Sequence, residues 1–250
     1  MSEITVLKIG GSVITKKSKD GIIDTAQMRK IATLIAPIAE SIPLVIVHGA
    51  GSCGHPEAKR YHIQDGVTLS NANGIAITHL AVQRLNEEFV SLLRAEGVDA
   101  VCMHPFCMSL AKNGRLIYSG EEQIKSLLSL NIIPVLHGDV VMDTVRGACI
   151  VSGDQIVTIM AKSLNANRVG VATDVPGVLS KGSVMPIITR ENVGLIDLST
   201  SAYTDVTGGM QGKVNELLQL ADIGISSHIF HISRVIDFLT KLDHGGTIVQ

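Results

Sequence analysis

Residues 44–56 read LVIVHGAGSCGHP, an apolar stretch followed at once by a loop that is rich in glycine. The stretch Leu44–His48 is almost entirely apolar, which is typical of a strand covered on both faces in a parallel sheet. The same arrangement occurs nearer the N-terminus, where Ile4–Ile9 (ITVLKI) precedes the glycine-bearing turn Gly10–Ser12. Two buried strands that both end in glycine predict a sheet whose strand-end loops bind the ligand.

Strand-like and helix-like segments alternate along the rest of the chain. Further strands are expected over 100–103, 132–137, 168–173, 227–231 and 246–249, and helices from 25 and over 74–96, 121–130, 155–164, 210–221 and 235–242. This alternation predicts an α/β fold, with an open, mostly parallel central sheet and helices on both faces. The segments 140–142 and 148–151 flank a polar turn and predict an antiparallel hairpin.

Composition excludes several classes of function. The 250 residues are 46% apolar and carry a formal net charge of −2, with no cluster of Lys or Arg to follow a nucleic-acid backbone. The four cysteines form no closely spaced pair, so we expect reduced thiols. No apolar stretch approaches the roughly 20 residues of a membrane span. These features predict a cytoplasmic protein with no nucleic-acid or membrane partner, in one domain over residues 1–250.

The glycine-bearing loops carry the chemistry. Backbone N–H groups can approach phosphate oxygens closely only where no Cβ intervenes, and a following helix points its positive end at the same place. Lys8, Lys17 and Lys213 add positive charge to three of these loops, and phosphoryl transfer needs mainly positioning and neutralisation of charge. The loops span 8–12, 48–56, 137–139 with 152–154, 173–177 and 205–213.

Each loop also has a plainer interpretation. A pair of glycines is often only a turn, and a surface lysine is usually only solvated. The chain has no Walker-type phosphate loop and no Gly-x-Gly-x-x-Gly turn before a helix, so the common nucleotide motifs do not apply. The joint occurrence of the five loops still favours a phosphate-handling site over a dehydrogenase.

His55 differs from the other histidines because it ends a glycine-rich loop and precedes Pro56, which restricts its backbone. A histidine in that place can donate a hydrogen bond to an anionic acceptor. We expect His48 and His137 to be structural, or to lie near the site without acting. An acceptor that is a phosphate monoester, with a second pKa of about 6, needs no strong general base at neutral pH.

At these loops the sequence resembles the amino-acid kinase superfamily and, within it, the isopentenyl phosphate kinases. The resemblance covers nearly the whole chain, and the GHP ending at 54–56 is the part specific to the subfamily. The motifs that carry it are LKIGGSVITKK (7–17), VHGAGSCGHP (47–56), HGDVVMD (137–143), VSGDQIV (151–157), ATDVPGV (172–178) and TDVTGGMQGK (204–213). It implies a three-layer sandwich, with an acceptor lobe over about 1–152 and a nucleotide lobe over about 153–250.

The resemblance also implies a reaction and a set of roles. Isopentenyl phosphate would be phosphorylated by ATP with magnesium (Mg2+), in a homodimer and with no metal ligand assigned to the protein. ATP would be bound by Lys8, Gly10, Gly11, Ser12, Gly51, Asp174, Leu179, Gly209 and Lys213. The acceptor phosphate would be contacted by Ala50, His55 and Gly153. Catalysis would use Lys8, Lys17, His55 and Lys213, with Asp154 orienting the lysines or magnesium.

Two other functions stay open at this point. The GHP loop would also suit a phosphonate such as fosfomycin, and an apolar lining from Ile63, Ile75, Leu80 or Leu136 would instead favour a prenyl chain. A non-catalytic protein of the same fold, which binds nucleotide or an oxyanion, is the second alternative. The presence of three loop lysines together argues against it, because a binding module could lose one without consequence.

Overall fold

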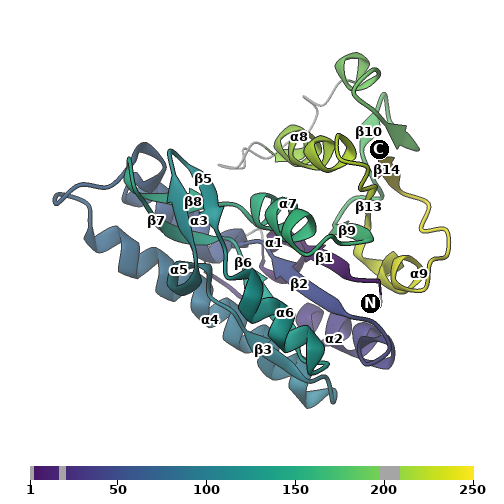
Figure 1. The fold of residues 1–250 in the computed structure, drawn as a ribbon, viewed down its shortest axis with the longest axis horizontal. Coiled ribbons are helices and arrows are strands. Elements are labelled where there is room, and N and C mark those ends of the chain that lie inside the picture. The colour runs from purple at the N-terminus through teal and green to yellow at the C-terminus, as the bar shows by residue number, and fades with distance from the viewer. Residues whose placement is uncertain (1–2, 17–20, 197–208) are drawn as a thin grey trace.

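The computed structural model describes residues 3–16, 21–196 and 209–250, and its centre is an eight-stranded sheet (Figure 1). Its strands are β1 (Thr5–Ile9), β2 (Leu44–His48), β3 (Ala100–Cys102), β6 (Ile133–His137), β9 (Arg168–Thr173), β12 (Ile187–Ile188), β13 (Ser227–His231) and β14 (Thr247–Val249). They follow the order β12-β14-β13-β9-β1-β2-β6-β3. Neighbours are parallel except β13 and β14, which confirms the predicted mostly parallel sheet.

The central strands end level with one another. Ile9, the last residue of β1, pairs with His48 at the end of β2 and with Ala172 near the end of β9. His48 in turn pairs with His137, the last residue of β6. The loops that follow these strands therefore leave the sheet at the same edge, where ligands of such folds bind.

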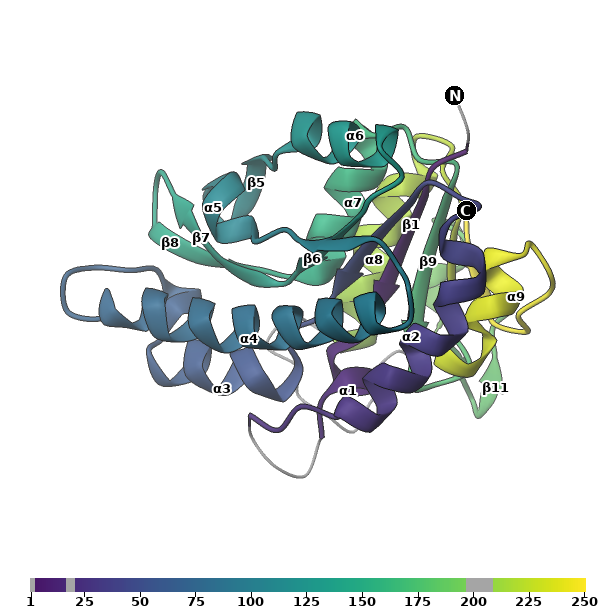
Figure 2. The same cartoon turned by 90° about the horizontal axis from the view of Figure 1, so that it is seen from below.

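Side chains of the strands alternate between two cores, one on each face of the sheet. On β1, for example, Leu7 and Ile9 belong to the first core and Val6 to the second. The first face is covered by α2 (Thr25–Ala39), α4 (Asn73–Ala95) and α9 (Val235–Leu239). The second is covered by α6 (Glu121–Ser129), α7 (Gly153–Ser163) and α8 (Gly209–Ala221). Figure 2 shows the sheet between the two groups, which confirms the expected three layers.

The long helices of the first layer begin and bury side chains as their sequences predict. Asp24 caps α2, since its Oδ1 accepts from the backbone N–H of Gln27 at 3.1 Å. The buried positions predicted on α4 all lie in the core: Leu85, Phe89, Leu92 and Leu93. Within the described ranges, no helix combines the length and the apolar character that crossing a membrane requires.

A second sheet stands apart from the first. Its strands are β4 (Leu110–Lys112), β5 (Arg115–Tyr118), β7 (Asp139–Asp143) and β8 (Gly147–Val151), in the order β5-β4-β7-β8. β7 and β8 form the predicted antiparallel hairpin. Burial opposes ionisation of Asp143, but backbone N–H groups outweigh it and lower the pKa of the carboxyl. The donors are Gly114, Arg146, Val145 and Asn113, at 2.6–3.0 Å.

The prediction of a glycine-rich loop over residues 48–56 is wrong for its second half, because residues Gly51–Arg60 form the helix α3. Pro56 lies inside this helix and has no N–H to donate to the carbonyl oxygen of Ser52. The backbone N–H of Gly21 donates to that oxygen instead, at 2.8 Å. The remaining short elements are α1 (Gly11–Ile14), α5 (Pro105–Met108), β10 (Leu179–Ser180), β11 (Ser183–Val184) and 3-10 turns at 63–65, 193–195 and 232–234.

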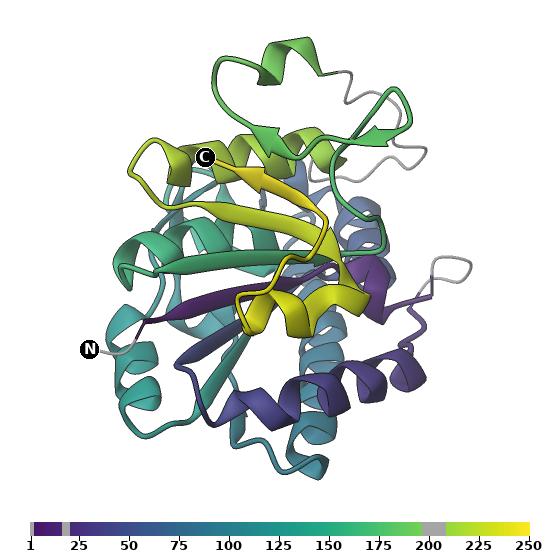
Figure 3. The same cartoon turned by 90° about the vertical axis from the view of Figure 1, so that its right-hand side faces the viewer.

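Gly170 on β9 is expected to tolerate no side chain, because Phe238 of α9, the short yellow helix in front of the sheet in Figure 3, packs against it. A Cβ at this position would lie 2.5 Å from Cε1 of Phe238. Gly170→Ala should therefore lower the free energy of unfolding by about 1–3 kcal/mol through overpacking. Urea denaturation measures this, with Gly194→Ala as the control, since a Cβ there would meet nothing within 4 Å. Equal stability of the two variants would contradict the packing described.

Candidate active site

The turns that follow β1 and β2 are packed backbone to backbone. The N–H of Gly49 donates to the carbonyl oxygen of Ile9 at 3.0 Å. A Cβ on Gly11 would lie only 2.3 Å from the backbone nitrogen of Gly51, so any side chain there would collide with the second turn. Glycine is needed for this approach, and the contact brings together two of the loops in which phosphate-binding N–H groups were predicted.

Thr15 connects the same two turns through its hydroxyl, a role that no sequence pattern predicted. Its Oγ1 donates to the carbonyl oxygen of Gly11 at 2.9 Å and accepts from the N–H of Ser52 at 3.0 Å. Gly51, which has a φ of +53°, turns the chain beside this hydroxyl, and a Cβ there would lie 2.3 Å from Oγ1. A buried threonine next to a glycine pair is too common a pattern to have been singled out.

The loops after β6 and β8 close on the same place. The N–H of Gly138 donates to the carbonyl oxygen of His48 at 2.9 Å. A Cβ on Gly138 would lie 3.2 Å from the nitrogen of Gly153 and 3.7 Å from that of Ala50. Ala50 and Gly153, two predicted acceptor contacts, are thus neighbours across Gly138. A Cβ on Gly153 would lie 3.0 Å from Cε of Lys8, which places that lysine beside them.

Asp154 holds two of the predicted lysines. Nζ of Lys8, which is almost completely buried on β1, lies 3.0 and 3.1 Å from the two carboxylate oxygens. Nζ of Lys213, on α8, lies 3.2 and 3.1 Å from the same two oxygens. Three residues from three separate elements therefore form one charge cluster, in which two ammonium groups share one carboxylate.

Burial and mutual charge set the protonation of this cluster. Burial opposes ionisation of Asp154, but the charges of Lys213 and Lys8 outweigh it and lower the pKa of the carboxyl. Burial lowers the pKa of Lys8, an effect that Asp154 opposes and Lys213 strengthens. With both lysines protonated, the cluster has an excess of one positive charge. An anion such as a phosphate group is the ligand that such an excess favours.

The start of α7 adds a second attraction for an anion. Ser152 caps this helix, since its Oγ accepts from the N–H of Gln155 at 3.1 Å. Gly153 and Asp154 form the first turn, where the helix dipole is positive. The serine with glutamine three residues later is a helix-start pattern that is visible in the sequence.

His55 lies on α3, which is pressed against α4. A Cβ on Gly54 would lie 2.5 Å from Cγ1 of Val82, so only glycine allows the two helices to come this close. His55 is half-buried there, on the helix that begins at Gly51. His55 therefore lies on a helix instead of ending a loop, and its backbone is helical although a following proline disfavours that conformation.

The other predicted nucleotide residues come from the first turn, the loop after β9, the strand β10 and the start of α8. The N–H of Gly10 donates to the carbonyl oxygen of Ala172 at 2.9 Å, which joins the first turn to β9. Gly209, with a φ of +57°, is the first residue of α8, the helix that carries Lys213. Ser12, Asp174 and Leu179 are exposed to solvent. Lys17 lies outside the described residues, so its predicted role stays a prediction.

His48 and His137 are fully buried behind the loops, in keeping with the structural role expected of them. Their rings stack with centroids 5.6 Å apart, and Nε2 of His48 lies 3.1 Å from Oδ1 of Asn86. Burial lowers the pKa of His48 to about 4. A histidine that stays neutral and enclosed in this way cannot supply charge to an anionic ligand.

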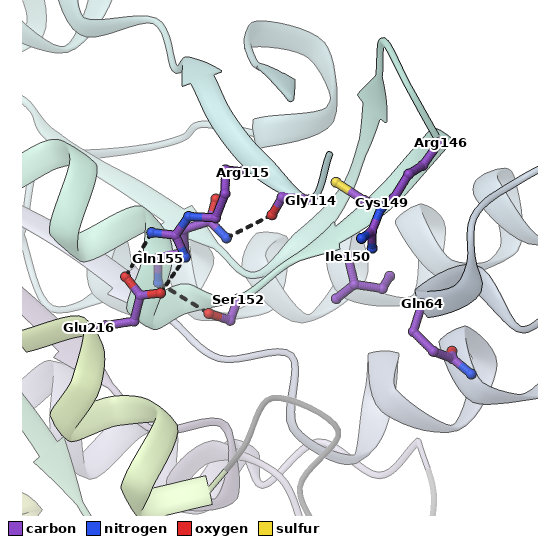
Figure 4. A pocket seen from close by; sticks show the side chains of 9 residues that line it. All are labelled: Gln64, Gly114, Arg115, Arg146, Cys149, Ile150, Ser152, Gln155 and Glu216. Atoms are coloured by element: carbon purple, nitrogen blue, oxygen red, sulfur yellow. Dashed lines mark hydrogen bonds and ion pairs between the residues drawn. The ribbon is translucent and has the colours of Figure 1, made fainter. Parts of the chain in front are cut away.

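Two features border the charge cluster on the side of the second sheet. One is a small apolar cluster of Ile63, Val140 and Ala148, against which Ile75 and Ile150 pack. The other is a pocket of about 260 Å³ (Figure 4). It is lined by Gln64, Gly114, Arg115, Arg146, Cys149, Ile150, Ser152, Gln155 and Glu216.

Of the four apolar residues considered for an acceptor tail, only two lie in this cluster. Ile63 belongs to it and Ile75 packs against it. Leu136 is buried in the second main core, because it points to the opposite face of the sheet. Leu80 is 47% exposed on α4. Leu136 therefore lies apart from this cluster, and the identity of the residues that line an acceptor tail stays a prediction.

The described residues form no metal site from side chains alone, whereas magnesium on ATP needs only one or two protein ligands. No group of three or more His, Cys, Asp or Glu side chains among the described residues is placed to hold a metal. The Asp154 carboxylate, the one proposed for that role, already has a lysine ammonium group within 3.2 Å of each oxygen. Of the two functions predicted for Asp154, the geometry favours holding the lysines.

Comparison with known proteins gives consistent relatives. The amino acid kinase family matches residues 3–231. An isopentenyl phosphate kinase from Haloferax volcanii is 39% identical over 248 residues, which cover 99% of this chain and 98% of the relative. One from Methanothermobacter thermautotrophicus is 38% identical over 242 residues, or 90% of each chain. A solved isopentenyl phosphate kinase structure superposes with a TM-score of 0.87 at 32% identity, covering 99% of this chain and 100% of that one.

Asp154→Asn should lower the pKa of Lys8 further. The carboxylate raises that pKa against burial and against the charge of Lys213, so its loss leaves only the two effects that disfavour protonation. An NMR titration of isotope-labelled lysine side chains measures the shift, which should move the Lys8 titration to lower pH. Asp222→Asn is the control, because Asp222 pairs with Arg190 on the surface. An unmoved Lys8 titration in Asp154→Asn would contradict the proposed coupling.

Proposed function

Because the chain belongs to the amino acid kinase family and, within it, to the isopentenyl phosphate kinases, we propose that it phosphorylates isopentenyl phosphate with ATP to give isopentenyl diphosphate. The observation that carries this proposal is the Lys8–Asp154–Lys213 cluster at the meeting point of the glycine turns. The cluster supplies the excess positive charge, and the glycine turns supply the close backbone approach, that phosphoryl transfer requires.

The two lysines act on the group that moves. A loose transition state spreads negative charge over the equatorial oxygens of the transferred phosphoryl group. Lys8 and Lys213 stabilise that charge, and Asp154 keeps their ammonium groups at a fixed spacing before the substrates arrive. We assign Lys17 to the same task from the resemblance. Preorganised charge of this kind lowers the barrier because little has to reorganise during the reaction.

ATP is proposed to lie against the turns after β1 and β2 and the start of α8. Backbone groups of Gly10, Gly11, Ser12, Gly51 and Gly209 would contact its phosphates, and Asp174 and Leu179 would lie along the nucleoside. Magnesium would enter on the ATP phosphates, since the described residues offer it no ligand set. The division into an acceptor lobe, about 1–152, and a nucleotide lobe, about 153–250, belongs to this proposal, as do a homodimer and a cytoplasmic location.

The acceptor phosphate is proposed to bind Ala50, His55 and Gly153. The acceptor oxygen attacks as part of a monoester that is largely ionised at neutral pH, so the site has to orient it and not to deprotonate it. Ala50 and Gly153 lie side by side across Gly138. His55 donates to the same phosphate from α3 and sets its angle of approach.

The similarity to isopentenyl phosphate kinases favours a prenyl tail over a phosphonate such as fosfomycin. Ile63, Val140 and Ala148 are fully buried, so they can only back the pocket, and Ile150, which packs against them, is the residue of this group that lines it. A non-catalytic binding protein would need less charge than Lys8 and Lys213 together supply, so the presence of both argues against that alternative.

ADP release by the purified protein tests the proposal directly. The panel of acceptors is isopentenyl phosphate, dimethylallyl phosphate, fosfomycin, uridylate and acetylglutamate, each with Mg-ATP. We expect fast turnover only with the prenyl phosphates. Turnover confined to another acceptor would overturn the substrate assignment. Absence of ADP release with every acceptor would favour the non-catalytic alternative.

His55→Ala should weaken use of the acceptor and leave ATP binding nearly unchanged. A hydrogen bond to a charged group is worth about 1.5–3 kcal/mol, so KM for isopentenyl phosphate should rise about 10- to 100-fold. Steady-state kinetics with each substrate varied in turn measure the two KM values. His62→Asn is the control, since His62 is exposed and Asn tolerates its φ of +52°. Equal weakening of both substrates would remove His55 from the acceptor site.

A further inference from the structure

Arg115 joins the second sheet to the helix that carries Lys213. It is the first residue of β5, and its guanidinium binds the carboxylate of Glu216 on α8 through both terminal nitrogens (Figure 4). The bond from Nη2 to Oε2 is 3.1 Å long, and Nη1 donates to Oε1. The two residues are 101 positions apart in the sequence, so the pair connects parts of the fold that have no local link.

Glu216 lies one turn after Lys213, and this turn of α8 is also fixed to α7. The carbonyl oxygen of Glu216 accepts from Oγ1 of Thr158 at 3.3 Å. The same hydroxyl lies 3.2 Å from the carbonyl oxygen of Asp154, so its single hydrogen is shared between the two carbonyl oxygens. Arg115 therefore binds α8 at Glu216, the same residue through which α8 contacts α7.

The other end of the connection is held by Gln155, the residue after Asp154. Its Oε1 accepts from the N–H of Leu116 at 2.7 Å, and its Nε2 donates to the carbonyl oxygen of Gly114 at 3.2 Å. These two bonds fix the backbone immediately before and after Arg115. Figure 4 shows Gln155 beneath this strand, with Glu216 on the facing helix.

The contacts form a closed ring. α7 reaches α8 directly, from Asp154 to Lys213, and a second time through Gln155, β5, Arg115 and Glu216. Two links between the same helices fix both the separation and the rotation of α8, which a single ion pair between flexible side chains cannot do. The rotation of α8 decides where the Lys213 ammonium group lies.

We propose that Arg115 is a positioning residue for the phosphoryl transfer, which acts by holding α8 so that Lys213 stays in register with Asp154 and Lys8. The inference rests on the proposed function, because it concerns the efficiency of that reaction. Both partners line the pocket beside the charge cluster, so the ring also connects the wall of the pocket to Lys213.

The chemistry of the pair suits a positioning role better than a stabilising one. The Arg115 side chain is 50% exposed, and exposed ion pairs add little to the free energy of folding. A bidentate guanidinium does fix an angle, because two parallel bonds define a direction that a lysine ammonium group cannot. Loss of the pair should therefore change turnover far more than stability.

Kinetics of Arg115→Met and Arg115→Lys test this. We expect kcat to fall about 10- to 100-fold in Arg115→Met, as for small misplacements of a catalytic group, with KM for ATP and for the acceptor little changed. Arg115→Lys should recover only part of the loss. The matched control is Arg190→Met, which removes another bidentate pair, to Asp222, with bonds of 3.0 and 2.7 Å and 53% exposure of the arginine. Its kcat should equal that of the wild type.

A double variant shows whether Arg115 acts through Lys213. If it does, Arg115→Met combined with Lys213→Met should be no slower than Lys213→Met alone, because the positioned group is already gone. Losses that multiply would overturn the proposal. So would an unchanged kcat in Arg115→Met.

Hydrogen exchange keeps the test independent of the substrate assignment. Without ligands, amides of α8 near Lys213 and Glu216 should exchange faster in Arg115→Met than in the wild type, whereas Arg190→Met, whose partner Asp222 follows the last turn of α8, should speed exchange at that end of the helix at most. Absence of ADP release by the wild type with every acceptor would contradict the proposed function. Unchanged hydrogen exchange of α8 in Arg115→Met would contradict the positioning role of Arg115. The two failures are thus seen in different measurements.

Discussion

Asp154 is a buried carboxylate between two lysine ammonium groups, and the arrangement of the site depends on it. Taking an ammonium group out of water costs several kcal/mol unless a partner compensates, so Lys8 can lie almost completely buried only because Asp154 is 3.1 Å away. The partners come from β1, α7 and α8, which means that the layers must dock before the charges compensate one another. The charge cluster therefore forms only when β1, α7 and α8 pack together during folding.

Glycine has a complementary function on the other side of the site. Gly11 and Gly51 bring two backbone segments closer than any side chain would allow, and Gly138 and Gly153 do the same for a second pair of loops. The lysines supply charge at fixed points, while the glycines supply uncharged N–H groups and space. A phosphate ligand needs both, since its oxygens are spread around a tetrahedron and one charged group reaches only some of them.

Local sequence signals predicted the fold well and pointed to the candidate residues, but they did not predict the partners of those residues. The apolar strands, the caps and the alternation of strands and helices depend on neighbours in the chain, and so does the presence of lysine beside a glycine turn. The partner of Lys8 is 146 positions away, and that of Arg115 is 101. α3 was missed because glycine and proline disfavour helices locally, whereas packing of Gly54 against Val82 stabilises one here.

The bond from Gly21 to Ser52, made possible by Pro56, joins α3 to the segment that leads into α2. The N–H of Lys16 donates to the carbonyl oxygen of Ile22 at 2.9 Å, so Gly21 and Ile22 connect this segment both to the helix that carries His55 and to the end of the first turn. Any other residue at position 56 would bring an N–H that competes with Gly21 for the Ser52 carbonyl oxygen. The proline that marks the end of a loop in the sequence therefore keeps an acceptor open for a distant part of the chain.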